Sequence, residues 1–263
     1  MRALLSMFTT IPLAGPRVSL RPLALPTEHG GWGFLLEPIA LGMAVRPSWG
    51  GALIAVAFVF GFLTRQPLRL VLQDLLRRKS YPRTRWCWTF ALLYAFAACA
   101  ALAAAVVISG WTAIFPIAVA APLGITQIFY DAHNRGRALL PELAGALAMT
   151  SSAAAIALAG GMRIAPALVL SAVIASRAIP SIVFVRTLMQ RAHGQASPSW
   201  PAILLHAIAI VLVALCATKL AVLAMIVLLA RAVWTLARPV PRAKTIGYRE
   251  LAYGAMTVIL AAA

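Results

Sequence analysis

Long apolar runs, separated by short clusters of Arg, Pro and Gly, dominate the chain from about residue 31 onward. A membrane-spanning helix needs about 20 largely apolar residues, and basic, Pro or Gly clusters are typical of the loops between such helices. A short amphipathic segment is expected at roughly 65–80, between the second and third helices. The pattern predicts nine helices, at about 31–46, 49–64, 86–109, 111–129, 139–161, 164–185, 200–217, 218–237 and 247–263.

The composition excludes an ordinary soluble domain. Hydrophobic residues make up 62% of the 263 residues and charged residues 11%, whereas about 25% of a soluble domain is charged. The net charge of +17 raises the alternative of a nucleic-acid partner. Basic loops on one side of a lipid bilayer are the commoner cause in such a chain, so we expect no nucleic acid. The sequence predicts an all-α polytopic membrane protein, with a leading segment (1–26) and a single transmembrane domain (27–263).

Lys and Arg are distributed unevenly over the predicted loops, and this bias predicts the orientation. With the amino terminus in the cytoplasm, 15 of the 23 basic residues fall in cytoplasmic loops, the leading segment holds three more, and the opposite loops hold three. Such a bias follows the positive-inside rule. It predicts nine spans with a cytoplasmic amino terminus and a carboxyl terminus on the other side.

The six acidic residues are the strongest indication of a functional site. A carboxylate at membrane depth is costly and normally faces a bundle interior or a water-filled cavity. Glu37 lies about two turns inside the first predicted helix, where it needs a partner or a proton. We expect the other five at the cytoplasmic ends of spans or in cytoplasmic loops; they are Glu28, Asp74, Asp131, Glu142 and Glu250.

Arginines near the membrane boundary are the natural partners of these carboxylates or of an anionic ligand. Arg65, Arg69 and Gln73 are spaced four residues apart and share one helical face beside Asp74. A guanidinium group binds phosphate or carboxylate through paired donors. We therefore include all four residues in the candidate site.

Arg177 lies inside the sixth predicted helix, and Ser181 follows on the same helical face. A charged residue within a span is a functional hypothesis that requires a partner. Glu37 and Glu142 are the candidates. His206, alone on an apolar helix, is expected to be a packed core residue.

Three further polar stretches have both a binding and a structural interpretation. The stretch 28–33 favours either a ligand or a tight turn into the first span. The stretch 130–137 allows a local ion pair between Asp131 and Arg135, and the stretch 244–250 allows Glu250 to interact with the dipole of the last helix. No spaced set of metal ligands accompanies them, so we expect no metal. The three cysteines, Cys87, Cys99 and Cys216, are expected to be buried and unpaired. The candidates in these stretches are Glu28, His29, Tyr130, Asp131, Asn134, Arg135, Lys244 and Glu250.

Three motifs resemble the YwiC-like family of bacterial membrane proteins. They are EHGGWG at 28–33, YDAHNRGR at 130–137 with PELAG at 141–145, and KTIGYRE at 244–250. The resemblance implies a multi-pass protein of the bacterial inner (cytoplasmic) membrane. It implies no established activity.

More distantly, the nine predicted spans and the motif around Tyr130, Arg135 and Glu142 are similar to UbiA-type prenyltransferases. In that superfamily, two Asp-rich motifs after the second and sixth spans hold magnesium on a prenyl diphosphate. Here the corresponding stretches keep one acidic residue, Asp74, among arginines. Magnesium needs several oxygen ligands in octahedral geometry, so we expect neither magnesium nor another cofactor.

Three functions remain open from the sequence. The first is a UbiA-like bundle that binds an anionic, isoprenoid- or quinone-like molecule, with or without a degenerate transferase reaction. The second is a transporter component for a small anion or protons, and the third is an assembly partner of a membrane complex. The first predicts a cytoplasm-facing cavity lined by Glu37, Arg65, Arg69, Glu142 and Arg177.

Overall fold

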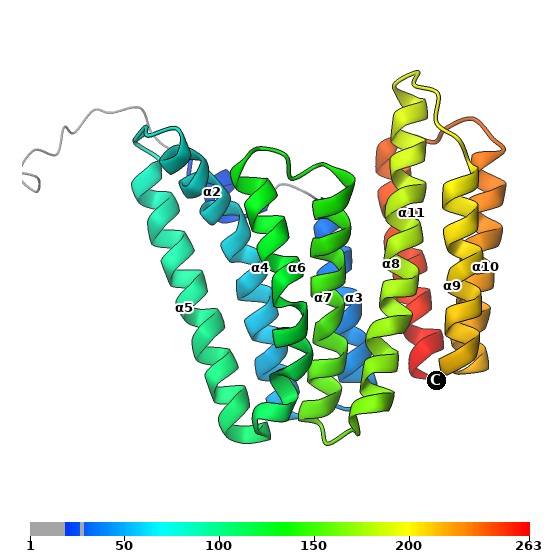
Figure 1. The fold of residues 1–263 in the computed structure, drawn as a ribbon, viewed down its shortest axis with the longest axis horizontal. Coiled ribbons are helices and arrows are strands. Elements are labelled where there is room, and N and C mark those ends of the chain that lie inside the picture. Colours follow the sequence, from blue (N-terminus) through cyan, green and yellow to red (C-terminus); the bar gives the residue numbers. More distant parts are fainter. Residues whose placement is uncertain (1–18, 27–28) are drawn as a thin grey trace, which may run out of the picture.

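The computed structural model describes residues 19–26 and 29–263, and every regular element within them is a helix. Figure 1 shows the long helices standing roughly side by side. In chain order the elements are α2 (Arg21–Ala24), α3 (His29–Val45), α4 (Trp49–Leu76), α5 (Thr84–Ser109), η2 (Trp111–Ile114), α6 (Phe115–Ala132), α7 (Leu139–Ala159), α8 (Ile164–Ala192), α9 (Trp200–Cys216), α10 (Lys219–Leu236) and α11 (Ala243–Ala262).

The prediction of an all-α protein of membrane type is confirmed for the described part of the chain. Six helical stretches there are long and apolar enough to cross a membrane, and two shorter ones are apolar, Gly30–Val45 and Trp200–Cys216. Helix α11 carries three charged residues in its first half. The six stretches are Trp49–Leu76, Thr84–Ser109, Trp111–Ala132, Leu139–Ala159, Ile164–Ala192 and Lys219–Leu236.

Two helices extend further than the sequence suggested. The prediction of a separate amphipathic segment at 65–80 is wrong, because α4 continues unbroken as far as Leu76 with Pro67 inside it. Its polar side chains contact neighbouring helices instead of a membrane surface, as described below. Helix α8 likewise runs to Ala192, beyond the predicted end at 185.

The loops alternate between two ends of the bundle. Figure 1 shows the loops after α4, α6, α8 and α10 at the top of the view, and the loops after α5 and α7 at the bottom, the end at which the carboxyl terminus also lies. The top loops carry most of the loop arginines and lysines of the sequence. We call this the basic end.

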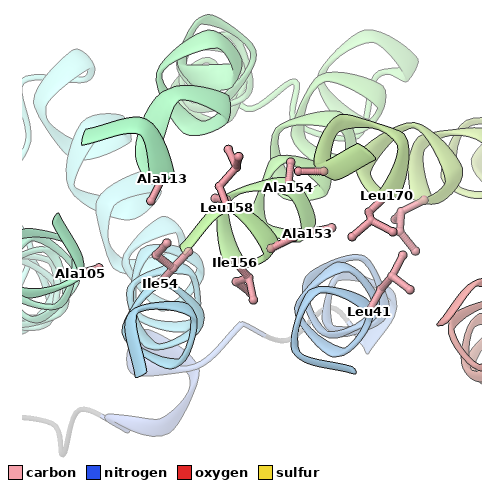
Figure 2. Close-up of a cluster of buried hydrophobic side chains, with 13 residues drawn as sticks. Leu41, Ile54, Ala105, Ala113, Ala153, Ala154, Ile156, Leu158 and Leu170 are labelled. Atoms are coloured by element: carbon pink, nitrogen blue, oxygen red, sulfur yellow. The ribbon is translucent and has the colours of Figure 1, made fainter. Parts of the chain in front are cut away.

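Helix α7 forms the centre of the largest hydrophobic core. It is mostly buried and rich in Ala, with two Ser and one Gly, and small residues allow helix backbones to approach closely. Figure 2 shows Ile156 of α7 between side chains of α3 and α4, including Leu41 and Ile54. A Cβ atom at Gly42 or Gly51 would crowd Ile156, so both glycines permit this approach.

The cysteines correct one expectation. Cys87 is buried, but Cys99 and Cys216 are exposed, and the described chain contains no disulfide. The outer surfaces of α5 and α9 are apolar themselves, with exposed Phe96 and Leu215. Apolar neighbours in the sequence therefore do not imply burial in a protein whose surroundings are lipid.

Candidate functional site

A cavity of about 1300 Å³ lies between α3, α4, α6 and α7 on one side and α8 and α11 on the other. Loop residues Arg137 and His193 line it, so the cavity extends to the basic end of the bundle. Further in, its lining includes Glu37, Arg177 and Glu250. The helix rise of 1.5 Å per residue places Glu37 about 12 Å from the start of α3.

The inner part of the cavity contains an ion pair between α3 and α8. Arg177 Nη2 lies 3.1 Å from Glu37 Oε1 and 3.7 Å from Glu250 Oε2. The same nitrogen donates a hydrogen bond of 2.7 Å to the backbone oxygen of Glu250. Arg177 is 2% exposed and Glu37 is 7% exposed. Of the two partners expected for Arg177, Glu37 is therefore correct, and Glu250 is an additional one.

Arg231 completes this group, and the sequence interpretation had placed it wrongly in a basic loop. It lies within α10, is buried, and forms an ion pair with Glu250 through Nη1 and Oε1. Its guanidinium lies 4.2 Å from the ring centroid of Phe184 and 5.1 Å from that of Tyr253, which are cation–π distances. The available signal was its position inside the apolar run 218–237.

Two polar residues extend the group around Arg231. Its Nη2 lies 3.4 Å from Ser181 Oγ and 3.5 Å from His206 Nε2. The other ring nitrogen of His206 lies 2.7 Å from the backbone oxygen of Ala202. The expectation of a buried core histidine is thus confirmed, although His206 also touches the charged group.

Glu37, Arg177, Arg231 and Glu250 form what we call the buried quartet. Its two carboxylates and two guanidinium groups balance in formal charge, as buried charges require. The hydrogen bonding is incomplete, because Oε2 of both glutamates and Nε of both arginines have no hydrogen-bond partner among the described residues. The sequence predicts Glu250 in the first turn of the last helix. This is wrong, because α11 already begins at Ala243 and Glu250 lies further along it.

A second ion pair connects α4 and α6 at the edge of the cavity. Arg65 donates from Nε to Asp131 Oδ2 at 2.7 Å and from Nη2 to Oδ1 at 3.2 Å. Gln73 Nε2 donates to the backbone oxygen of Asp131 at 2.8 Å. A side chain at Gly136 would clash with the Asp131 carboxylate. The alternative of a local pair between Asp131 and Arg135 is therefore wrong, because α6 ends at Ala132.

Asp74 has a structural position outside the cavity. Its carboxylate accepts hydrogen bonds from Arg83 Nη2 at 2.9 Å and from Thr84 Oγ1 at 2.7 Å. These contacts connect the end of α4 to the start of α5, and Asp74 is 1% exposed. Arg69 also lies outside the main cavity, in a small recess with Pro26 and Gln66.

At the basic end, an ion pair joins α7 to α8. Arg186 Nη1 lies 3.2 Å from Glu142 Oε2 and donates to the backbone oxygen of Arg137 at 3.0 Å. Glu142 is the other candidate partner for Arg177 from the sequence, but Arg177 lies nine residues before Arg186 on α8 and pairs with Glu37 instead. Lys244 also lines the cavity here, with its Nζ 5.8 Å from the Tyr248 ring centroid.

The predicted site residues therefore separate into several groups. The cavity is lined by Glu37, Arg65, Glu142, Arg177, Ser181, Lys244 and Glu250, so four of the five residues expected around a cavity do line it. Asp131 and Gln73 support Arg65 from outside, and Asn134 forms the turn after α6 with φ of 57°. Glu28 and the side chain of His29 lie outside the described part of the chain. The candidates outside the cavity lining are Arg69, Gln73, Asp74, Tyr130, Asp131, Asn134 and Arg135.

The described residues contain no group of three or more His, Cys, Asp or Glu side chains that could hold a metal ion. The cationic members of the site outnumber the acidic ones. Five cationic side chains and three carboxylates line the cavity, which leaves a formal charge of +2.

These features define a helical protein of membrane type with a polar cavity between its helices. The chain belongs to the YwiC-like protein family, whose model matches residues 25–158. No curated protein and no solved structure matches the chain. The family segment covers α3 to α7 almost completely, whereas Arg177, Arg231 and Glu250 lie beyond it.

Proposed function

We propose that this YwiC-like protein binds an anionic, amphipathic molecule in the cavity, with the anionic group toward the basic end. The observation that carries the proposal is the net charge of +2 on the lining, because guanidinium groups bind carboxylate or phosphate through paired donors. Apolar side chains such as Phe34, Phe62 and Met149 share the lining. The volume of about 1300 Å³ exceeds that of a usual small-molecule pocket, about 300–1,000 Å³, and suits a lipid-like body.

We further propose nine membrane spans in a UbiA-like arrangement in the bacterial inner membrane, with the basic end in the cytoplasm. Each of the nine predicted segments coincides with a helix, and α3, α9 and α11 would be the three spans beyond the six long apolar stretches. The positive-inside rule supports the orientation. In this arrangement the ligand enters from the cytoplasmic side, and magnesium has no role.

The direct test is mass spectrometry of lipids and small molecules that purify with the protein in mild detergent. Wild-type protein should retain one anionic amphiphile far above its share of the membrane extract. Val185→Trp fills the cavity without changing its charge and should reduce that enrichment about tenfold or more. Arg163→Gln, at the opposite end of α8, is the matched control and should retain it. Bulk lipid composition in all three samples would contradict the proposal.

Transport of protons or a small anion is the second candidate, and the buried Glu37–Arg177 pair favours it. Ionisable residues within membrane helices commonly mark ion or proton pathways. Flux into proteoliposomes that requires Glu37, and is absent from Glu37→Gln, would favour transport over binding alone. Absence of flux in wild-type proteoliposomes would exclude it.

A further inference from the structure

The charges of the cavity lining are arranged at two levels. At the basic end, which we call the mouth, Arg65, Arg137, Arg186 and Lys244 accompany Glu142, and Asp131 pairs with Arg65, which leaves a formal charge of +2. At the inner level, Arg177 and Arg231 balance Glu37 and Glu250 in formal charge. The cavity is therefore basic at its mouth and neutral further in, where its carboxylates are hydrogen-bond acceptors.

The spacing of the two levels can be measured along α8. Arg177 and Arg186 belong to this helix and line the cavity nine residues apart, which corresponds to about 13 Å. Ile182 and Val185 lie between them on the same lining. A ligand that reaches both levels therefore needs an apolar middle of about this length.

Glu37 is the residue at the inner level that needs a further partner. It is 7% exposed, its Oε1 faces Arg177, and its Oε2 has no hydrogen-bond donor among the described residues. A buried, charged acceptor without a donor is unfavourable. Because the last torsion of a glutamate side chain is broad and roughly two-fold, rotation about it can turn a carboxylate oxygen toward a group in the cavity that Glu37 lines.

Glu250 repeats this arrangement on the opposite helix. Its Oε1 contacts Arg231, and its Oε2 lies 3.7 Å from Arg177 Nη2 without a hydrogen bond. The carboxylates of α3 and α11 thus each have one oxygen that lacks a hydrogen-bond donor. The complementary ligand group is a hydrogen-bond donor, either a hydroxyl or an amine.

We infer that the ligand is a two-headed amphiphile, with an anionic group at the mouth and a hydroxyl or amine about 13 Å further in that donates to Glu37. This inference rests on the proposed function and adds the chemistry of the second head. Arg186 and Lys244 hold the anion, and Ile182 and Val185 contact the apolar middle. Glu37 selects molecules that carry a donor at the inner end.

The test is a competition between two probes that differ by one hydroxyl group, dodecyl phosphate and ω-hydroxydodecyl phosphate. Both are offered at equal concentration to the full-length protein in nanodiscs, and bound molecules are counted by native mass spectrometry. Wild type should prefer the hydroxylated probe about tenfold, because a hydrogen bond to a charged group contributes a factor of this order. The ratio is measured within one sample, so it does not depend on the folded fraction.

Variants then separate the two levels. Glu37→Gln should reduce the preference for the hydroxylated probe to within about twofold. Glu250→Gln should also reduce this preference, independently of the change at Glu37. Arg186→Gln should lower binding of both probes and leave the preference intact, and Arg163→Gln should change neither. Equal binding of the two probes by wild type, or an unchanged preference in Glu37→Gln, overturns the inference and leaves the proposed function standing. Binding of neither probe by wild type overturns the proposed function as well.

Discussion

Removal of Arg231 should destabilise the protein, and removal of both Arg231 and Glu250 should cost less than the two single changes together. Breaking a buried ion pair by removing one partner typically costs about 3–5 kcal/mol. Glu250 retains Arg177 at 3.7 Å and its side chain is 17% exposed, so we expect the lower limit, about 3 kcal/mol, for Arg231→Met. At roughly 2–4 °C per kcal/mol for a chain of similar size, the melting temperature should fall by about 6–12 °C.

The double variant tests whether the cost of losing Arg231 comes from leaving the Glu250 charge without its partner. Arg231→Met with Glu250→Gln removes one positive and one negative charge, and the Glu37–Arg177 pair remains neutral. Replacing both members of a buried pair is often nearly neutral for stability. The double variant should therefore be more stable than the sum of the single changes predicts, by about 1 kcal/mol or more.

Cys87 provides the assay, because it is fully buried while the other two cysteines are exposed. In a Cys99→Ser, Cys216→Ser background, a thiol-reactive fluorescent dye reports unfolding through Cys87 during heating in mild detergent. Arg163→Gln serves as the control for loss of an arginine. A melting temperature for Arg231→Met equal to that of the control, or strict additivity in the double variant, would refute the reasoning.

Three further predictions follow from other contacts. Asp131→Asn removes one charge of the ion pair between α4 and α6 and should lower the melting temperature by several degrees in the Cys87 assay, unlike a change at an exposed position. Gly254→Ala should also be destabilising, because its Cβ would clash with the Glu37 carboxylate; adding Glu37→Ala should restore part of the loss, and no restoration would contradict this contact. In a cysteine-free background, a membrane-impermeant maleimide should label Arg163→Cys in intact spheroplasts but Ser80→Cys only after permeabilisation; the reverse pattern would contradict the proposed orientation.

Helix positions could be predicted from the sequence because they depend on local patterns. Each predicted apolar run coincides with a helix, since run length and bounding Pro, Gly and basic residues are properties of neighbouring positions. The amphipathic segment after the second run was misjudged for a related reason. Its polar residues, Arg65 and Gln73, contact α6, and a contact 58 to 66 residues away leaves no trace in the local pattern.

The partners of the charged residues were harder to predict than their presence. Glu37 with Arg177 was expected because both lie within spans and each needs a partner. Asp131 with Arg65, and Glu142 with Arg186, join residues whose helices meet only in the folded bundle. Basic residues near span ends have two interpretations, an ordinary cytoplasmic loop or a site, and Arg231 was assigned to the wrong one.

The buried quartet depends on both halves of the chain. Glu37 lies in the segment that matches the family model, residues 25–158, but its salt-bridge partner Arg177 lies on α8, and the other two members of the quartet lie on α10 and α11. A buried carboxylate without its cation is strongly destabilising. Residues 25–158 therefore lack the arginine that pairs with the buried Glu37 carboxyl group. In the proposed binding mode, the inner level includes α8 and α11, so variation in these helices should change ligand preference even where residues 25–158 are unchanged.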